Sequence, residues 1–275
     1  MEGRWTSMQR IKLELFKTFF EKNLTGNEID FLIALTYVQD NRGVARGVFY
    51  RDMMAVTGMS TQAFYDCKRS LETKGVISVQ RKEQDYDITL IGNDFSGYTE
   101  EDYQLGNVKY IRTNMKLFRD INWNKLKPAQ KLLVMDLVNI NTASSMRTYR
   151  ITRKKFIEKY TELLQVTGRT LQKYMKFLKL YFYVGLKEGM YYITLRKQFS
   201  SSITRTESDE VNRHLLNTAC RRNRIKEQDE KEAADILAVI SRYRKEIQNS
   251  FCDVIDIFEP VSYTHLRAHE TLANL

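Results

Sequence analysis

The sequence has few of the residues that break helices or cross-link small secreted domains. It holds only two prolines, Pro128 and Pro260, which favours a largely helical chain without disordered linkers. Its cysteines, Cys67, Cys220 and Cys252, are widely spaced and odd in number, which indicates reduced thiols and a cytoplasmic protein. No apolar run approaches the roughly 20 residues that span a bilayer, and no secretory leader is recognisable. We therefore expect no membrane partner.

Motifs of common catalytic and metal sites are also missing. The cysteines and histidines form no cluster with zinc-ligand spacing, and the pair His265 and His269 encloses no glutamate in the position that zinc peptidases need. No glycine-rich loop ends in Gly-Lys-Ser or Gly-Lys-Thr, the signature of a phosphate-binding loop. We expect a protein that is not an enzyme and has no metal or other cofactor, and no small-molecule ligand is evident.

Positive charge is concentrated in one part of the chain. Residues 107–198 carry 20 lysines and arginines against 5 aspartates and glutamates, whereas residues 1–93 carry 13 against 12 and residues 199–275 carry 11 against 13. A field of one sign attracts polyanions, nucleic acid first. The alternative is a basic surface that only keeps the protein soluble.

The sequence contains an internal repeat. Residues 59–71 align with residues 166–178 at an offset of 107, and the tripeptide Ile-Thr-Leu recurs at 88–90 and 193–195. Upstream residues match at an offset of 102. This period is too long for one unit of a solenoid, so it predicts two similar domains in tandem.

The clearest element of the repeat is an amphipathic helix that begins after Thr167, a residue suited to cap a helix N-terminus. Apolar residues recur at helical spacing on one face, and a hairpin with a tight turn at residues 187–189 follows. A helix that enters the major groove and a hairpin beside the backbone are the parts of a winged helix-turn-helix. The residues expected to contact DNA on the outer face of this helix and at the hairpin are Arg169, Gln172, Lys173, Lys176, Lys179 and Lys187.

The equivalent helix of the first repeat begins after Ser60, and a hairpin is expected over 76–90. Asp66 and Glu72 weaken the case for phosphate contact there, and the alternative is a merely solvated face. The candidate DNA contacts are Thr61, Gln62, Tyr65, Arg69, Arg81 and Lys82.

Other helix starts are also readable. Thr25 and Glu28 form a capping-box pattern, Thr152 precedes a helix expected over 153–164, and Pro128 suits a first helical turn. Residues 48–57 are expected to form a short helix, and the lead-in at 1–23 a strand or a short helix.

These patterns divide the chain into six parts. We expect domain 1 (1–93), an acidic linker (94–106), basic domain 2 (107–198), a linker (199–206), a charged helical region (207–260) and a tail (261–275). The helical region either packs back on the domains or forms a homodimer, and its basic cluster at 221–224 is expected to be a solvated face. The tail resembles translated sequencing-adaptor sequence, so we expect the natural C-terminus to be missing.

Residues 10–198 resemble bacterial tandem winged-helix proteins, and among them replication initiators of plasmids and mobile elements. The resemblance implies a mainly α fold with small β-wings and two winged helix-turn-helix domains, to which the charged helical region is expected to add a C-terminal helical tail. It also implies binding to repeated double-stranded DNA at an origin. The alternatives are a transcriptional regulator of the same fold and a winged-helix module that binds protein.

Overall fold

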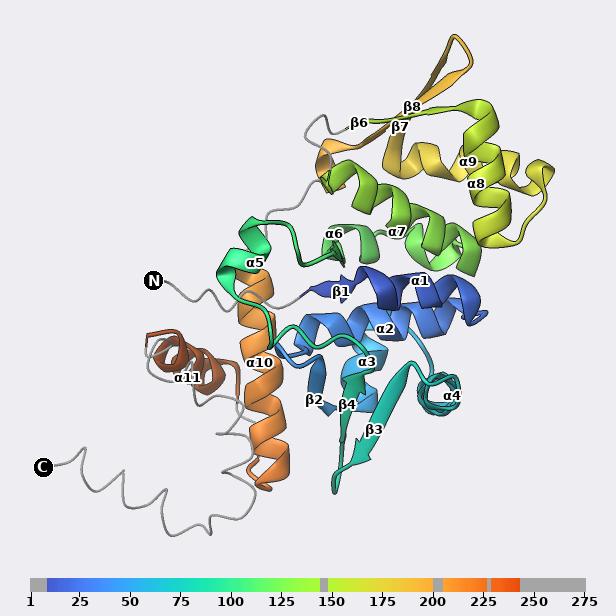
Figure 1. The fold of residues 1–275 in the computed structure, drawn as a ribbon. Helices are drawn as coiled ribbons and strands as arrows, with labels where there is room; N and C mark the ends of the chain where they lie inside the picture. The colour runs from blue at the N-terminus through green and yellow to red at the C-terminus, as the bar shows by residue number, and fades with distance from the viewer. Residues whose placement is uncertain (1–8, 144–147, 200–204, 227–228, 243–275) are drawn as a thin grey trace, which may run out of the picture.

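The computed structural model describes residues 9–143, 148–199, 205–226 and 229–242 (Figure 1). The first repeat contains β1 (Arg10–Lys12), α1 (Leu13–Glu21), α2 (Gly26–Val38), β2 (Val44–Val48), α3 (Tyr50–Thr57), α4 (Thr61–Thr73), β3 (Ile77–Arg81) and β4 (Tyr86–Leu90). Helix α5 (Glu100–Gln104) leads to the second repeat: β5 (Tyr110–Arg112), α6 (Met115–Phe118), η1 (Trp123–Lys125), α7 (Pro128–Ala143), β6 (Thr148–Thr152), α8 (Arg153–Leu164), α9 (Gly168–Tyr181), β7 (Phe182–Lys187) and β8 (Met190–Leu195). After η2 (Lys197–Phe199) come α10 (Arg205–Arg222) and α11 (Glu230–Arg242).

The strands are not confined to two small wings. They form three antiparallel sheets with the orders β1-β5, β2-β4-β3 and β6-β8-β7. The expectation of a mainly α fold with small β-wings is therefore wrong, and the described chain is a mixture of α and β. Strands β2 and β6 carry no local signal in the sequence, because such short strands gain their stability from the neighbours they pair with.

Local signals place the helix starts correctly. The hydroxyl of Thr25 accepts from the Glu28 N–H while the Glu28 carboxylate accepts from the Thr25 N–H, which is the expected capping box. Ser60, Thr152 and Thr167 cap α4, α8 and α9 in the same way, each accepting from the N–H three residues on. These caps are confirmed, because each depends only on residues within one helical turn.

The two repeats share one hydrophobic core. β1 pairs with β5 across the repeats, and α2 packs against α7. Between these helices the Lys131 ammonium lies 2.6 Å from the Asp30 carboxylate, which also accepts from the Trp123 indole N–H at 2.8 Å. Burial raises the pKa of the Asp30 carboxyl, and Lys131 and Trp123 oppose that rise. A buried charge is tolerated only with such partners, so this pair fixes how the repeats sit against each other.

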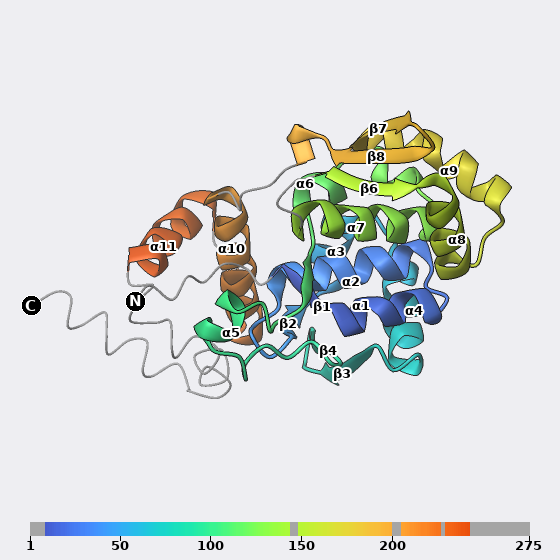
Figure 2. The same cartoon turned by 45° about the horizontal axis from the view of Figure 1, so that its top comes forward.

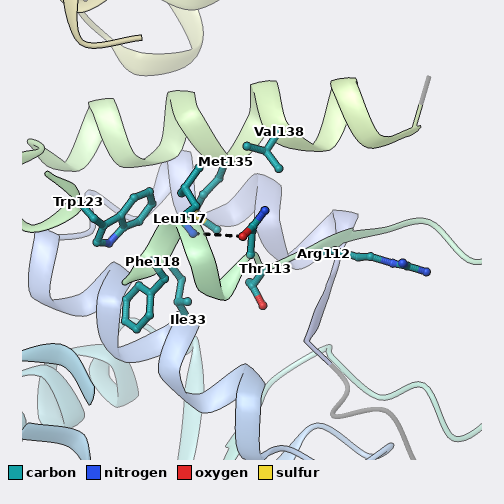
Figure 3. Close-up of a pocket in the computed structure, with 9 residues that line it drawn as sticks. Ile33, Arg112, Thr113, Leu117, Phe118, Trp123, Met135 and Val138 are labelled. Carbon is teal, nitrogen blue, oxygen red and sulfur yellow. Dashed lines mark hydrogen bonds between the residues drawn. The ribbon is translucent and has the colours of Figure 1, made fainter. Parts of the chain in front are cut away.

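A small cavity lies in the same interface (Figure 3). Its volume is about 20 Å³, which is room for about one water molecule. Trp123 and Met135 of the second repeat line it together with Ile33 of α2, whereas the side chain of Arg112 points away. The repeats therefore pack closely, with no room for a ligand in this cavity.

Helix α10 packs back on the first repeat, beside strand β2 (Figures 1 and 2). Arg221 and Arg222 both reach Asp85 of the β3–β4 hairpin, at 3.3 and 2.9 Å, and Arg222 also binds Asp87. The expectation that residues 221–224 form a solvated face is therefore wrong for these two arginines, although Arg224 is exposed. Their carboxylate partners lie more than 130 residues away, so no local pattern could show the pairing.

His214 belongs to the same contact. Its Nε2 lies 2.7 Å from the carbonyl oxygen of Arg46, and its Nδ1 lies 3.9 Å from the Asp52 carboxylate. Burial lowers the pKa of His214, against the opposing effects of these two oxygens. Helix α11 contacts α10. One of the two expectations for the helical region, packing back, is thus confirmed for α10, whereas self-association stays a prediction.

Gly47 of β2 lies close to Thr218 of α10. Its φ is +66°, and a Cβ there would lie 2.2 Å from the Thr218 side chain. We predict that Gly47→Ala weakens the packing of α10 against β2, because the new methyl group and the Thr218 side chain cannot occupy the same space. Limited proteolysis should then cut around α10 faster. Gly92→Ala is the control, since Gly92 has a φ of +80° but no neighbour within 4 Å. Equal proteolysis of the two variants would show that backbone strain alone is responsible.

Part of the chain lies outside this description. The expectation of an artefactual tail at 261–275 and the pair His265 and His269 fall outside the described residues. Among the residues that are described, no helix is both long and apolar enough to cross a membrane. The segment expected to be a linker, 94–106, contains α5, whose N-terminus is capped by Thr99.

Candidate nucleic-acid interface

Helix α9 is held in place by the apolar face that the sequence predicts. It follows α8 after a tight turn in which Gln165 adopts the left-handed conformation, with φ of 51°. Leu171, Tyr174, Leu178 and Tyr181 are buried against the second repeat. Such side chains recur every three or four residues, so the opposite side of the helix must face away from the core.

That opposite side carries the predicted cations. The side chains of the five candidate residues are exposed, and none forms an ion pair with another described residue: Arg169, Gln172, Lys173, Lys176 and Lys179. The hydrogen-bond donors of these side chains are left to solvent in the described part of the chain. The helix therefore presents a basic surface with one amide side chain among the cations and with Phe177 and Leu180 also exposed.

The β7–β8 hairpin extends beyond α9 (Figure 1). Glu188 and Gly189 form its two-residue turn with φ of 51° and 73°, as a turn with two left-handed residues requires. Lys187 at the turn lies 3.8 Å from the Glu188 carboxylate. Both side chains are highly exposed, so this ion pair is weak. Lys187 can therefore exchange its partner for a phosphate.

The structure adds cations that the sequence analysis did not single out. The backbone N–H of Arg153 donates to the carbonyl of Gly189 at 2.8 Å, so the start of α8 meets the hairpin turn. Arg153, Lys154 and Lys155 are exposed there. The run of three basic residues is visible in the sequence, but only the pairing of β6 with β8 shows that it lies near the hairpin.

The first repeat presents a weaker version of this surface. Thr61, Gln62 and Arg69 of α4 are exposed, but the Gln62 amide already donates to the Asp66 carboxylate at 2.9 Å. Tyr65 is half-buried and packs on neighbouring rings. In the β3–β4 hairpin Arg81 is exposed, whereas Lys82 lies 4.0 Å from the Asp87 carboxylate. Much of the predicted set in this repeat thus contacts protein.

The two candidate helices lie on one side of the molecule. In Figures 1 and 2, α4 and α9 are both on the right, whereas α10 and α11 lie on the left. The shared core and the ion pair between α2 and α7 hold this arrangement. One extended ligand could therefore meet both helices.

Other kinds of site are sparse in the described part of the chain. It contains no group of three or more His, Cys, Asp or Glu side chains placed to hold a metal ion. Cys67 is buried, and burial raises the pKa of its thiol to about 12, which makes it unreactive. A cavity of about 260 Å³ separates α2 and α3 from α10, and its lining is largely apolar. Comparisons with known protein families, with curated proteins and with solved structures find no match for this chain.

Proposed function

We propose that this protein binds double-stranded DNA, with α9 in the major groove and the β7–β8 hairpin along the backbone. One observation carries the proposal: α9 is packed rigidly on one face while its other face exposes four cations and a glutamine. The major groove is about 12 Å wide and admits one α-helix. Rigid presentation matters because flexible cations lose entropy when they bind.

Position along α9 separates two roles. Residues near the N-terminal end of a recognition helix reach base edges, while later residues more often meet phosphates. Arg169 and Gln172 lie in the first turns of the helix, and Lys176 and Lys179 lie further on. Arginine can bind guanine O6 and N7 together, and glutamine can bind adenine N6 and N7. We therefore assign base reading to Arg169 and Gln172.

The first repeat contributes a second, weaker contact in this proposal. Its helix α4 lies on the same side of the molecule as α9 but has fewer free cations. The first repeat has almost no net charge, which does not favour DNA over protein as its partner, so binding to another protein stays an alternative for this repeat.

For the biological role we propose replication initiation at a plasmid or mobile-element origin, with transcriptional regulation as the alternative. The support is the resemblance of residues 10–198 to tandem winged-helix initiators and the order helix, strand, helix, helix, hairpin in both repeats. Sequencing the DNA that the purified protein retains will separate the two roles. Sites clustered in repeated origin sequences favour initiation, and sites clustered at promoters favour regulation.

Site selection tests the assignment of the base-reading residues. We predict that Arg169→Ala and Gln172→Ala each weaken binding to the preferred site by about 1–3 kcal/mol and relax base preference at one position. Arg42→Ala and Gln104→Ala are matched controls, because they remove the same side-chain types at exposed positions outside α9. Arg42 lies in the turn before β2, and Gln104 is the last residue of α5. Unchanged base preference in the Arg169 and Gln172 variants would reject α9 as the reader.

A further inference from the structure

The two three-stranded sheets are equivalent, but among the described residues a helix, α10, covers only the outer face of the first. Val79 pairs with Ile88 in the first sheet as Val184 pairs with Ile193 in the second, which sets the alignment. In this register Asp87 corresponds to Tyr192. Helix α10 covers Asp87, because Arg222 of that helix forms an ion pair with the Asp87 carboxylate. In the second repeat, α7, α8 and α9 contact the sheet, and α10 lies elsewhere in the molecule.

The uncovered side of the second sheet is its outer face, opposite the core. Alternation along the strands puts Tyr191 inward, where its ring packs on Phe156, and Tyr192 outward. By the strand register the outer residues include Thr148, Arg150, Tyr183, Gly185, Tyr192 and Thr194, and we call these six the open sheet face. Tyr183 is 57% exposed.

The open sheet face combines aromatic rings with cations. The Arg196 guanidinium lies 4.7 Å from the Tyr183 ring centroid, and that of Arg150 lies 5.8 Å from the Tyr192 ring centroid. Gly185 is opposite Tyr192, and a Cβ there would come within 3.9 Å of the Tyr192 Cβ. Because residue 185 is a glycine, no side chain from β7 covers the side of the Tyr192 ring.

We propose that the open sheet face binds single-stranded nucleic acid. Unpaired bases stack on exposed aromatic side chains, and neighbouring cations hold the backbone phosphates. Tyr183 and Tyr192 are diagonal neighbours on adjacent strands, so two bases can stack side by side. Arg150 and Arg196 supply the cations.

Charge argues against the other occupants. A second copy of α10 would bring Arg221 and Arg222, which bind aspartates in the first repeat, toward Arg150. An acidic helix of another protein would satisfy the cations but would make no specific use of the exposed Tyr183 ring and the half-buried Tyr192 ring. The Arg196 Nε also donates to the Lys179 carbonyl of α9 at 3.1 Å, but the rings and cations of the open sheet face are not the side chains assigned to duplex binding on that helix.

Fluorescence anisotropy on the full chain tests the proposal, with a labelled 15-nucleotide oligo(dT) and a labelled 15-base-pair duplex as probes. We expect Tyr183→Ala combined with Tyr192→Ala to weaken oligo(dT) binding at least tenfold, because each stacked base contributes about 1–3 kcal/mol. Duplex binding should change less than threefold, because the hairpin side chain assigned to duplex DNA is Lys187 at the turn and not either tyrosine. The matching Tyr→Phe pair should retain oligo(dT) binding, since it keeps both rings, and Tyr98→Ala in the 94–106 segment should have no effect. The melting temperature of each variant checks folding.

Several results would overturn this inference. The first is unchanged oligo(dT) binding in the double alanine variant. The second is a loss of duplex binding in that variant as large as its loss of oligo(dT) binding. The third is that a helical acidic peptide displaces the labelled oligo(dT) while unlabelled oligo(dT) does not. Loss of duplex binding in Gln172→Ala with oligo(dT) binding intact would support two separate sites. Wild-type protein that binds oligo(dT) but no duplex would refute the proposed function and leave this inference standing.

Discussion

Replacing Lys173, Lys176 and Lys179 together with glutamine will greatly weaken binding to duplex DNA and flatten its salt dependence. These ammonium groups lie exposed along α9 beside Arg169. Each phosphate that a cation neutralises contributes a slope of about −0.9 in log K against log salt. Three lost contacts should reduce the slope by about 2.7 units, which corresponds to roughly two to three orders of magnitude in affinity at 0.1 M salt. Binding titrations from 0.05 to about 0.3 M salt measure both quantities.

The matched control removes the same number of charges elsewhere. Arg42, Lys109 and Lys231 are exposed and lie outside α9 and the β7–β8 hairpin. Their combined replacement by glutamine should leave the slope nearly unchanged if contacts with DNA are local to α9. Similar losses in the two triple variants would show that the protein attracts DNA only through its net charge.

Asp30→Ala will destabilise the protein by about 3–5 kcal/mol, because it leaves the Lys131 ammonium buried without its carboxylate. The Lys131 side chain is only 3% exposed, and its closest partner is Asp30 at 2.6 Å. Urea denaturation measures the loss in the free energy of unfolding. Asp30→Leu combined with Lys131→Met should recover much of it, since replacing a whole buried ion pair by apolar residues is often neutral.

An exposed ion pair provides the comparison. Lys154 and Glu158 are 3.9 Å apart on α8 and highly exposed, so Glu158→Ala should cost no more than about 0.5 kcal/mol. If Asp30→Ala lowers the free energy of unfolding as little as Glu158→Ala does, water reaches the interface between the repeats. A large cost that Lys131→Met does not relieve would instead assign the loss to the Trp123 N–H, which also donates to Asp30.

The sequence by itself determined the features that depend on neighbouring residues. The repeat, the caps at Thr25, Ser60 and Thr167, and the two faces of α9 are all present in the structure. Each follows from side chains within a few residues, since helical periodicity and capping act over one or two turns. The concentration of cations in residues 107–198 likewise needs no fold to be seen.

Only the tertiary structure decided which distant residues meet. Strands β2 and β6 exist through their pairing with β4 and β8, which overturned the mainly α expectation. Arg221 and Arg222 become half-buried because Asp85 and Asp87 of the β3–β4 hairpin bind them. The open sheet face is likewise assembled from three strands, β6, β7 and β8. Strand pairing and buried ion pairs join residues with no fixed spacing in the chain, so no local pattern could reveal them.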